Sequence, residues 1–382
     1  MKTMIDLSRS MRDAMRLIKG GDLNGATEAI QRGLGVQAGP TPGDSEGGPG
    51  SGSPWIDGES CRIEDAPPEK VDHPDTARPH NRCRTSAGEF MDDKFISDAG
   101  EMDYKLFIPA GLDVTAAPPL LVMLHGCTQS PDDFARGTRM NALAQDRGYV
   151  VAYPAQSTSK NMGKCWNWFR RQDQRRGEGE PAMIAALTRY LVRTHGLDER
   201  RVYVAGLSAG GAMAAVLAST YPDIYAAIGV HSGLPFGVAH DLPSALAAMK
   251  QGLNISAALI PQTRIDLVPT IVFHGDRDTT VDPCNGEAVI AQSIGLSSVA
   301  PSPADALSRI DERGSVVGGH AYTRTVFKNA DGSVAAEQWI VHGAGHAWFG
   351  GDLAGSYTDP SGPDASENML RFFAACMRRP LQ

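Results

Sequence analysis

Residues 201–211 of the 382-residue chain read RVYVAGLSAGG, and the small-residue run AMAAVLAS follows directly. The apolar run from Arg201 to Ala205 predicts a buried strand, and the alanine-rich run favours a helix. Glycines at the junction let the two backbones approach closely and hold Ser208 in a strained conformation that exposes its hydroxyl. The alternative is a glycine-rich turn that only caps a helix. The position of Ser208 between a predicted strand and a predicted helix favours a nucleophilic serine at the positively polarised amino end of that helix.

Strand-like runs and amphipathic helical stretches alternate through the chain after Gly88. The predicted strands are Tyr104–Ile108, Leu120–Leu124, Tyr149–Tyr153, Val202–Ala205, Tyr225–Val230, Thr270–Phe273 and Gln338–Val341. The predicted helices are Arg139–Arg147, Pro181–His195, Ala209–Thr220, Cys284–Ser293 and Asp364–Met377. This alternation predicts an α/β fold with a mostly parallel sheet and helices on both faces. Chemistry in such a sheet collects at the carboxyl ends of the strands.

A serine hydroxyl needs a histidine to accept its proton and a carboxylate to hold that histidine in the useful tautomer. In this fold both follow the serine, the acid first. Asp276, Asp278 and Asp282 all follow the predicted strand Thr270–Phe273. Asp276 lies in the immediate turn and Asp282 is placed to cap the next helix. We therefore expect Asp278 to be the acid.

Two histidines follow the predicted strand Gln338–Val341 in the sequence HGAGHAW. His342 falls at the strand end and is interpreted as a packed or solvated residue. His346 lies beyond it in a glycine-flanked loop, where its ring can reach Ser208. We expect His346 to be the general base.

The predicted strand Leu120–Leu124 ends in HGCTQ, where folds of this type supply an oxyanion-stabilising amide. We expect the backbone N–H groups of Cys127 and Ala209 to form the oxyanion hole. Cys127 and Cys165 could also form a disulfide.

Aromatic residues concentrate in CWNWF, residues 165–169, and beside His346. Trp166, Trp168 and Trp348 are candidates for substrate contact, although aromatic side chains more often lie in the core. The stretch from Leu234 to Pro269 has the length and apolar content of a lid over the site.

Composition excludes several classes of protein. The net charge of −8 lacks the basic excess of nucleic-acid binders, so no nucleic-acid partner is expected. No apolar run is long enough for a membrane-spanning helix, and the amino-terminal residues lack the apolar core of a signal peptide, which favours a cytoplasmic location. The six cysteines are widely spaced and do not decide the redox compartment. Metal-binding HExxH and dinucleotide-binding GxGxxG patterns are absent, so we expect no metal and no cofactor.

The sequence divides into three regions. Residues 1–35 show apolar residues at helical spacing on both sides of Gly20-Gly21, which predicts a short helical hairpin. Residues 36–87 are predicted to be a linker and irregular segment, because thirteen of the seventeen residues from Ala38 to Pro54 are Gly, Pro or Ser. Residues 88–382 form the predicted catalytic domain.

The motifs LHGCTQSPDDF, CWNWF, GLSAGG, HGDRDTTVDP and GAGHAWFGG, over roughly residues 90 to 378, resemble the polyhydroxybutyrate depolymerase family of esterases. That family, of α/β-hydrolase fold, includes feruloyl and acetyl-xylan esterase relatives. The resemblance implies the same triad and Cys127 amide, and an ester substrate such as a short hydroxyalkanoate polyester or its oligomers. It also makes an extracellular location an alternative, although neither a signal peptide nor a polymer-binding module after Met377 is evident.

These residues predict a serine esterase that works through an acyl-enzyme. The alternative is a feruloyl or acetyl-xylan esterase with the same triad. A serine peptidase on the same fold is disfavoured, since no long amino-terminal gating domain is evident. A non-catalytic polymer-granule or scaffold protein is disfavoured by the three triad residues at strand ends. Nothing in the sequence selects an oligomeric state.

Overall fold

The computed structural model describes residues 88–97, 100–251, 267–295 and 307–378. The predicted amino-terminal hairpin, and the linker up to residue 87, lie outside the described residues. None of the described helices is long and apolar enough to cross a bilayer.

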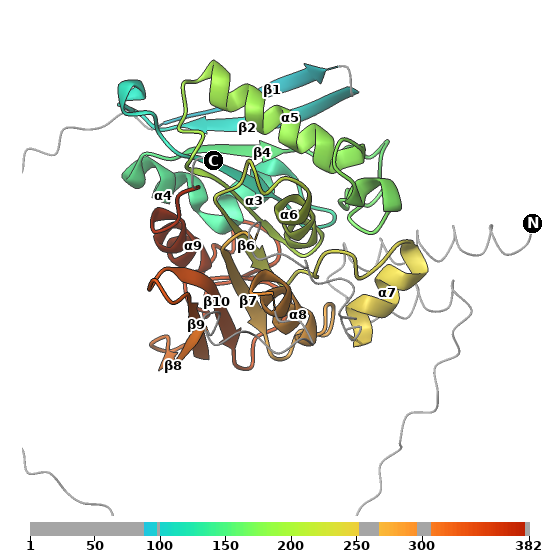
Figure 1. Ribbon diagram of the computed structural model, residues 1–382, viewed down its shortest axis with the longest axis vertical. Coiled ribbons are helices and arrows are strands. Elements are labelled where there is room, and N and C mark those ends of the chain that lie inside the picture. Colours follow the sequence, from blue (N-terminus) through green and yellow to red (C-terminus); the bar gives the residue numbers. More distant parts are fainter. Residues whose placement is uncertain (1–87, 98–99, 252–266, 296–306, 379–382) are drawn as a thin grey trace, which may run out of the picture. The chain divides into compact units, whose positions relative to one another are not determined.

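The described strands form a ten-stranded sheet in the order β1-β2-β4-β3-β5-β6-β7-β10-β9-β8, and a separate two-stranded pair (Figure 1). The ten strands are β1 (Glu89–Ser97), β2 (Gly100–Ile108), β3 (Leu120–Leu124), β4 (Val150–Pro154), β5 (Val202–Leu207), β6 (Ala227–His231), β7 (Thr270–Gly275), β8 (Ser308–Ser315), β9 (Ala321–Lys328) and β10 (Val334–Val341). The small pair is β11 (Trp348–Phe349) and β12 (Thr358–Asp359). The neighbours from β4 to β10 run parallel, and an antiparallel hairpin extends each edge. The predicted mostly parallel sheet is confirmed.

Helices cover both faces of the sheet, as predicted (Figure 1). One face carries α5 (Gly179–Thr194), α6 (Ala209–Thr220), α7 (Leu242–Gln251) and α8 (Cys284–Ser293). The other carries α3 (Pro131–Thr138), α4 (Met140–Arg147) and α9 (Ala365–Ala374). Short 3-10 turns lie at η1 (Val114–Ala116) and η2 (Arg171–Gln174).

The central strands are apolar throughout because both of their faces are buried. In β3, Leu120, Val122 and Leu124 pack with the α5 and α6 side, whereas Leu121 and Met123 pack with the α4 and α9 side. Alternate residues of a strand point to opposite faces, so a strand between two helix layers needs apolar residues at every position. All five β3 residues are buried.

Candidate active site

Ser208 occupies the sharp turn between β5 and α6. Its backbone angles, φ 57° and ψ −117°, lie in a region that residues with a Cβ rarely adopt. Its N–H donates to the carbonyl oxygen of His231 at 2.8 Å, which fixes the turn against the end of β6. A Cβ at Gly210 would lie 2.0 Å from the Leu124 carbonyl oxygen, so the close passage of α6 over β3 requires glycine there. The strand, turn and helix arrangement is therefore as predicted.

Asp278 and His346 are brought together by neighbouring strands. Asp278 follows β7 and His346 follows β10, and these strands pair in parallel. His346 Nδ1 lies 2.6 Å from Asp278 Oδ2. The Asp278 side chain is fully buried, and that of His346 is 11% exposed. Within the part of the chain that the structure describes, the other ring nitrogen of His346 has no hydrogen-bond partner, so the carboxylate orients an imidazole that can exchange a proton at Nε2.

The surroundings of Asp278 favour its ionised form. Its Oδ1 accepts the N–H groups of Thr280 at 2.8 Å and Val281 at 2.9 Å. Burial acts to raise the pKa of Asp278, but hydrogen bonds from His274, His346 and the Val281 amide outweigh it and hold that pKa well below the usual value. The carboxylate is thus a fixed negative charge beside the His346 ring.

The two competing aspartates have other partners. Asp276 Oδ2 lies 2.9 Å from His342 Nδ1, and its Oδ1 accepts the Gly343 N–H at 2.7 Å. Asp282 Oδ1 accepts the N–H of Cys284, the first residue of α8, at 3.0 Å. Asp276 and His342 therefore form a second, more exposed acid and histidine pair, whereas Asp282 holds the start of a helix.

In the loop after β3, the Cys127 amide differs from its neighbours. The Gly126 N–H donates to Gln129 Oε1, and the Thr128 N–H donates to the Gly163 carbonyl oxygen. The Gln129 N–H donates to the Gly126 carbonyl oxygen. Among the described residues the Cys127 N–H has no hydrogen-bond acceptor. Ala209 is the first residue of α6, where an N–H has no acceptor in a preceding turn. These are the two amides expected to form the oxyanion hole.

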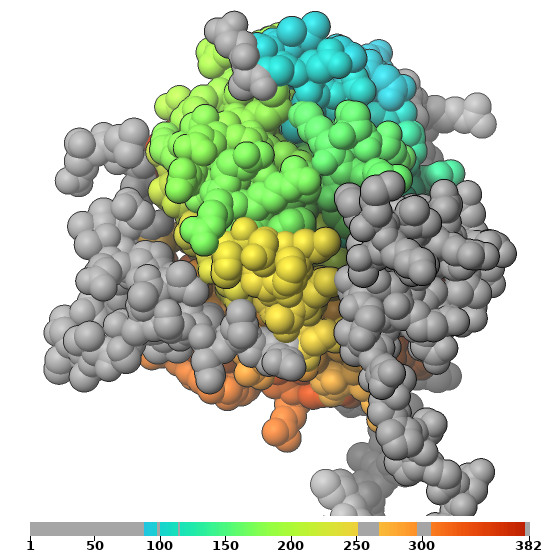
Figure 2. Space-filling view, turned by 90° about the vertical axis from the view of Figure 1, so that its right-hand side faces the viewer, coloured from blue at the N-terminus to red at the C-terminus, as the bar shows by residue number. Residues whose placement is uncertain are grey.

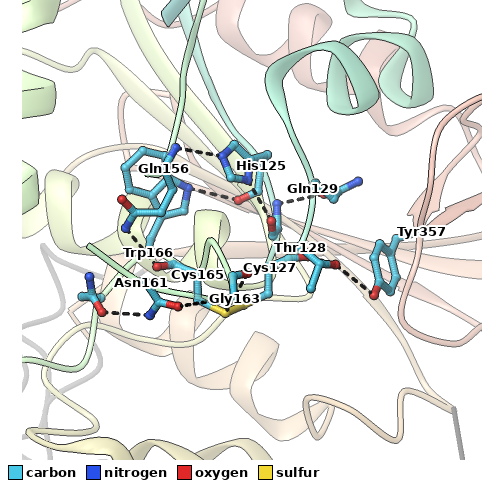
Figure 3. Close-up of a disulfide and its surroundings, with 12 residues drawn as sticks. His125, Cys127, Thr128, Gln129, Gln156, Asn161, Gly163, Cys165, Trp166 and Tyr357 are labelled. Atoms are coloured by element: carbon cyan, nitrogen blue, oxygen red, sulfur yellow. Dashed lines mark hydrogen bonds between the residues drawn. A yellow bond between two sulfur atoms is a disulfide. The ribbon is translucent and has the colours of Figure 1, made fainter. Parts of the chain in front are cut away.

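A disulfide anchors this loop (Figure 3). Cys127 and Cys165 are bonded, with Cα atoms 4.2 Å apart, and the bridge joins segments 38 residues apart in sequence. Cys284 and Cys376 are free among the described cysteines.

The three tryptophans that the sequence names as candidates for substrate contact are buried in this structure. Trp166 is 0% exposed, Trp168 5% and Trp348 1%. Their indoles lie in the two cores, where the Trp166 N–H donates to the His125 carbonyl oxygen and the Trp348 N–H to Ser366 Oγ. Their burial favours the core alternative, and substrate contact by these residues stays an untested prediction.

His231, the last residue of β6, links the nucleophile to the histidine loop, and sequence reasoning did not single it out. Its carbonyl holds the Ser208 N–H, and its ring Nε2 accepts the Phe349 N–H at 3.1 Å. The ring is fully buried between Phe273 and Trp348. The only sequence signal was a histidine at the carboxyl end of a predicted central strand.

The proposed lid is described only in part, because residues 252–266 lie outside the described residues. Within the described part, the Ala239 carbonyl accepts from Gln174 Nε2 at 2.6 Å, and the Met249 carbonyl accepts from the Asp282 N–H at 2.7 Å. Figure 2 shows this segment, in yellow, beside the green loop and helix that precede β5. The segment thus contacts the acid-bearing loop, and its role as a lid stays a prediction.

The sequence profile of the family described as Esterase PHB depolymerase matches residues 102–312, which is more than half of the chain. This protein belongs to that family. The match includes Ser208 and Asp278 and ends before His346. The family resemblance predicted from the motifs is therefore confirmed.

The relatives of this PHB depolymerase family member include proteins named as a depolymerase and as esterases. Poly(3-hydroxyalkanoate) depolymerase C of Paucimonas lemoignei is 31% identical and aligns with 66% of this chain but only 60% of its own length. Feruloyl esterase B of Thermothelomyces thermophilus is 32% identical, over 49% of this chain and 67% of its own length. The solved acetyl xylan esterase from Aspergillus awamori covers 75% of this chain and is itself covered completely, with 20% identity and a TM-score of 0.58. The shared architecture confirms the predicted α/β-hydrolase fold.

Proposed function

We propose that this protein is a serine ester hydrolase in which Ser208, Asp278 and His346 are the nucleophile, acid and base. The observation that carries the proposal is the 2.6 Å contact between a buried carboxylate and a partly exposed imidazole. Both follow strands whose carboxyl ends share one edge of the sheet with the Ser208 turn. The names of the relatives support an ester as substrate.

The chemistry proceeds through an acyl-enzyme. Ser208 Oγ attacks the ester carbonyl carbon while His346 accepts the hydroxyl proton. The negative charge that develops on the carbonyl oxygen is stabilised by the Cys127 and Ala209 amides. His346 then protonates the departing alcohol. Afterwards a water molecule attacks the acyl group while His346 accepts its proton. Asp278 stabilises the positively charged imidazole through both steps.

The proposed substrate is a short hydroxyalkanoate ester, as a polyester or its oligomers. The depolymerase relative supports this choice over feruloyl or acetylxylan esters, because its sequence similarity extends over 66% of this chain, against 49% for the feruloyl esterase and 53% for an acetylxylan esterase relative.

The test compares wild type and Ser208→Ala on p-nitrophenyl esters of increasing acyl length, amorphous polyhydroxybutyrate and methyl ferulate. We expect turnover to be fastest on hydroxybutyrate substrates and to be lost in the variant, with thermal unfolding unchanged. A preference for ferulate or acetyl esters would retain the triad and reject the substrate. An inactive, folded wild type would reject the esterase proposal in favour of a binding or scaffold protein.

The proposed site of action is an oxidising compartment, in place of the cytoplasm expected from the sequence. Disulfides persist mainly in oxidising environments, and the Cys127–Cys165 bridge lies at the proposed oxyanion hole. Thiol titration of protein isolated from its native compartment under alkylating conditions tests this. A fully reduced pair there would contradict it.

A further inference from the structure

Glu180 is a buried carboxylate that the proposed chemistry does not use. It lies in the first turn of α5 and is 6% exposed. Its Oε1 accepts the side-chain amides of Gln156 and Asn167, both at 2.5 Å, and its Oε2 accepts the Asn167 backbone N–H at 2.7 Å. Burial raises the pKa of Glu180, and these hydrogen bonds offset that rise only in part. All three partners are donors, so the site is built for a group with acceptors only.

Gln156 connects this carboxylate to the oxyanion loop. Its side-chain amide also donates to the Cys165 carbonyl oxygen at 2.9 Å, and its backbone N–H donates to Nε2 of His125 at 3.2 Å. Burial lowers the pKa of His125 to about 4, so the ring is neutral near pH 7. Because Nε2 accepts, the ring proton is on Nδ1, which lies 2.8 Å from the Gly126 carbonyl oxygen and donates to it.

The Gly126 carbonyl and the Cys127 N–H belong to one peptide unit. That unit is planar and trans, so its C=O and N–H point in opposite directions. A carbonyl held inward by the buried His125 ring therefore aims the Cys127 N–H outward, away from the core. The orientation of one proposed oxyanion donor thus depends on a ring that Gln156 holds.

Further contacts join the same two segments (Figure 3). The Trp166 indole N–H donates to the His125 carbonyl oxygen at 3.1 Å, and the Thr128 N–H donates to the Gly163 carbonyl oxygen at 2.7 Å. The Cys127–Cys165 bond is the covalent link. The segment from Gln156 to Asn167 is therefore the support of the oxyanion loop, and Glu180 holds both of its ends.

We propose that Glu180 is a positioning residue for the oxyanion hole: it fixes residues 156–167, which orient the Gly126–Cys127 peptide unit. The inference rests on the proposed esterase function and adds a residue to it. Asp173, whose Oδ1 accepts the Glu180 N–H at 2.6 Å, is the neighbouring acid that holds the start of α5. Glu180 acts through other groups and does not itself contact the substrate.

The test is Glu180→Gln, which replaces one acceptor oxygen with a donor and so opposes one of the three N–H partners. We expect kcat to fall about tenfold, less than the loss of roughly a hundredfold or more from deleting an oxyanion donor, while KM changes less than twofold. The inhibition constant of an alkyl boronate, which forms a tetrahedral adduct on the serine, should rise by the same factor as kcat/KM falls.

Glu337→Gln is the matched control. Glu337, on β10, is also buried and accepts hydrogen bonds from Arg324, Arg371 and the Trp339 indole, none of which belongs to the oxyanion loop. The Glu337→Gln variant should have a lower unfolding temperature and unchanged kcat and boronate affinity. If Glu180→Gln does not fold, Asn167→Ala replaces it. This variant removes one donor to Glu180 and keeps the backbone contact, so we expect a smaller loss of kcat at unchanged KM.

The outcomes separate the two proposals. Suppose that the wild type is active and depends on Ser208. Unchanged kcat and boronate affinity in Glu180→Gln, or in its replacement Asn167→Ala, would then overturn the positioning role alone. Equal loss of kcat in Glu180→Gln and Glu337→Gln would also overturn it, because the effect would then follow general destabilisation. A folded wild type without Ser208-dependent turnover would overturn the esterase proposal and this inference together.

Discussion

His346 Nδ1 and Asp278 Oδ2 are 2.6 Å apart, at the ends of adjacent parallel strands. A second pair, His342 and Asp276, joins the same two loops at 2.9 Å. The pairs differ in burial: the Asp278 carboxylate is fully enclosed, whereas that of Asp276 is 38% exposed. An ion contact in a water-poor site orients a ring far more strongly than one open to solvent.

Asp278→Asn should reduce kcat by roughly 10⁴-fold, because a neutral amide neither selects the useful His346 tautomer nor stabilises the imidazolium. Asp276→Asn is the matched change in the exposed pair, and it should leave kcat within about twofold. Steady-state kinetics on a p-nitrophenyl ester measures both. If Asp276→Asn shows the larger loss, the acid has been assigned to the wrong aspartate.

Gly210→Ala should prevent the elbow from forming, since its Cβ would lie 2.0 Å from the Leu124 carbonyl oxygen and 2.6 Å from the carbonyl carbon. Both contacts are with backbone, which has no rotamer by which to move aside. We expect at least about 3 kcal/mol of destabilisation. Gly345→Ala is the control, because a Cβ there meets nothing within 4 Å. Thermal unfolding of both variants is the measurement, and a Gly210→Ala melting curve like that of wild type would refute the close passage.

The central strands and the elbow were predictable from sequence because both faces of the sheet are buried. Continuous apolar runs therefore marked β3 and β5 closely, and α6 began and ended as predicted. Strand β8 gave no such signal, since its residues SRIDERGS are almost all exposed at the sheet edge. Helix α3, which follows the Ser130 N-cap, was also missed, because its residues PDDFARGT include a proline and a glycine, which have low helix propensity.

The supporting residues of the site were harder to find. Glu180 stands in a stretch of charged and glycine residues, GEGEP, typical of an exposed helix start, and only the packed structure shows its three donors. His231 has no local motif. The burial of the tryptophans near Cys165 could not be decided from the sequence, because spacing alone does not distinguish an exposed loop from one folded into the core.

Removing the disulfide with Cys127→Ser and Cys165→Ser should lower the free energy of unfolding. The bond closes a loop between positions 38 residues apart, for which the loss of chain entropy in the unfolded state corresponds to about 4 kcal/mol. Cys284→Ser, at a free and partly buried cysteine, is the control. Urea unfolding with and without reductant gives the comparison: reductant should destabilise wild type and leave the double variant unchanged. An equal response in both would show that the bond does not form.

Stability should fall as the pH drops from about 6.5 towards 4, because His125 and His231 are buried in neutral form. Burial lowers the pKa of His125 to about 4 and holds that of His231 well below its usual value. Above about pH 6.5 neither the folded nor the unfolded protein protonates these rings, so no stability is lost. Below it the unfolded chain binds protons that the folded protein does not, and each histidine costs about 1.4 kcal/mol per pH unit. The loss from His125 ends near its folded pKa.

The contribution of Asp278 lies in a separate window. Its pKa is lowered in the folded protein, so its stabilising effect is complete above about pH 4 and is lost only as the pH falls further. Urea unfolding between pH 7.5 and 4.5 therefore excludes Asp278, while the buried carboxyls Asp173 and Glu180, whose pKa values burial raises, contribute equally to wild type and to a histidine variant. His231→Gln, which cannot titrate, should make the slope shallower than in wild type by about 1.4 kcal/mol per pH unit. A slope equal to that of wild type would mean that His231 takes up its proton in the folded state, which its enclosure between Phe273 and Trp348 opposes.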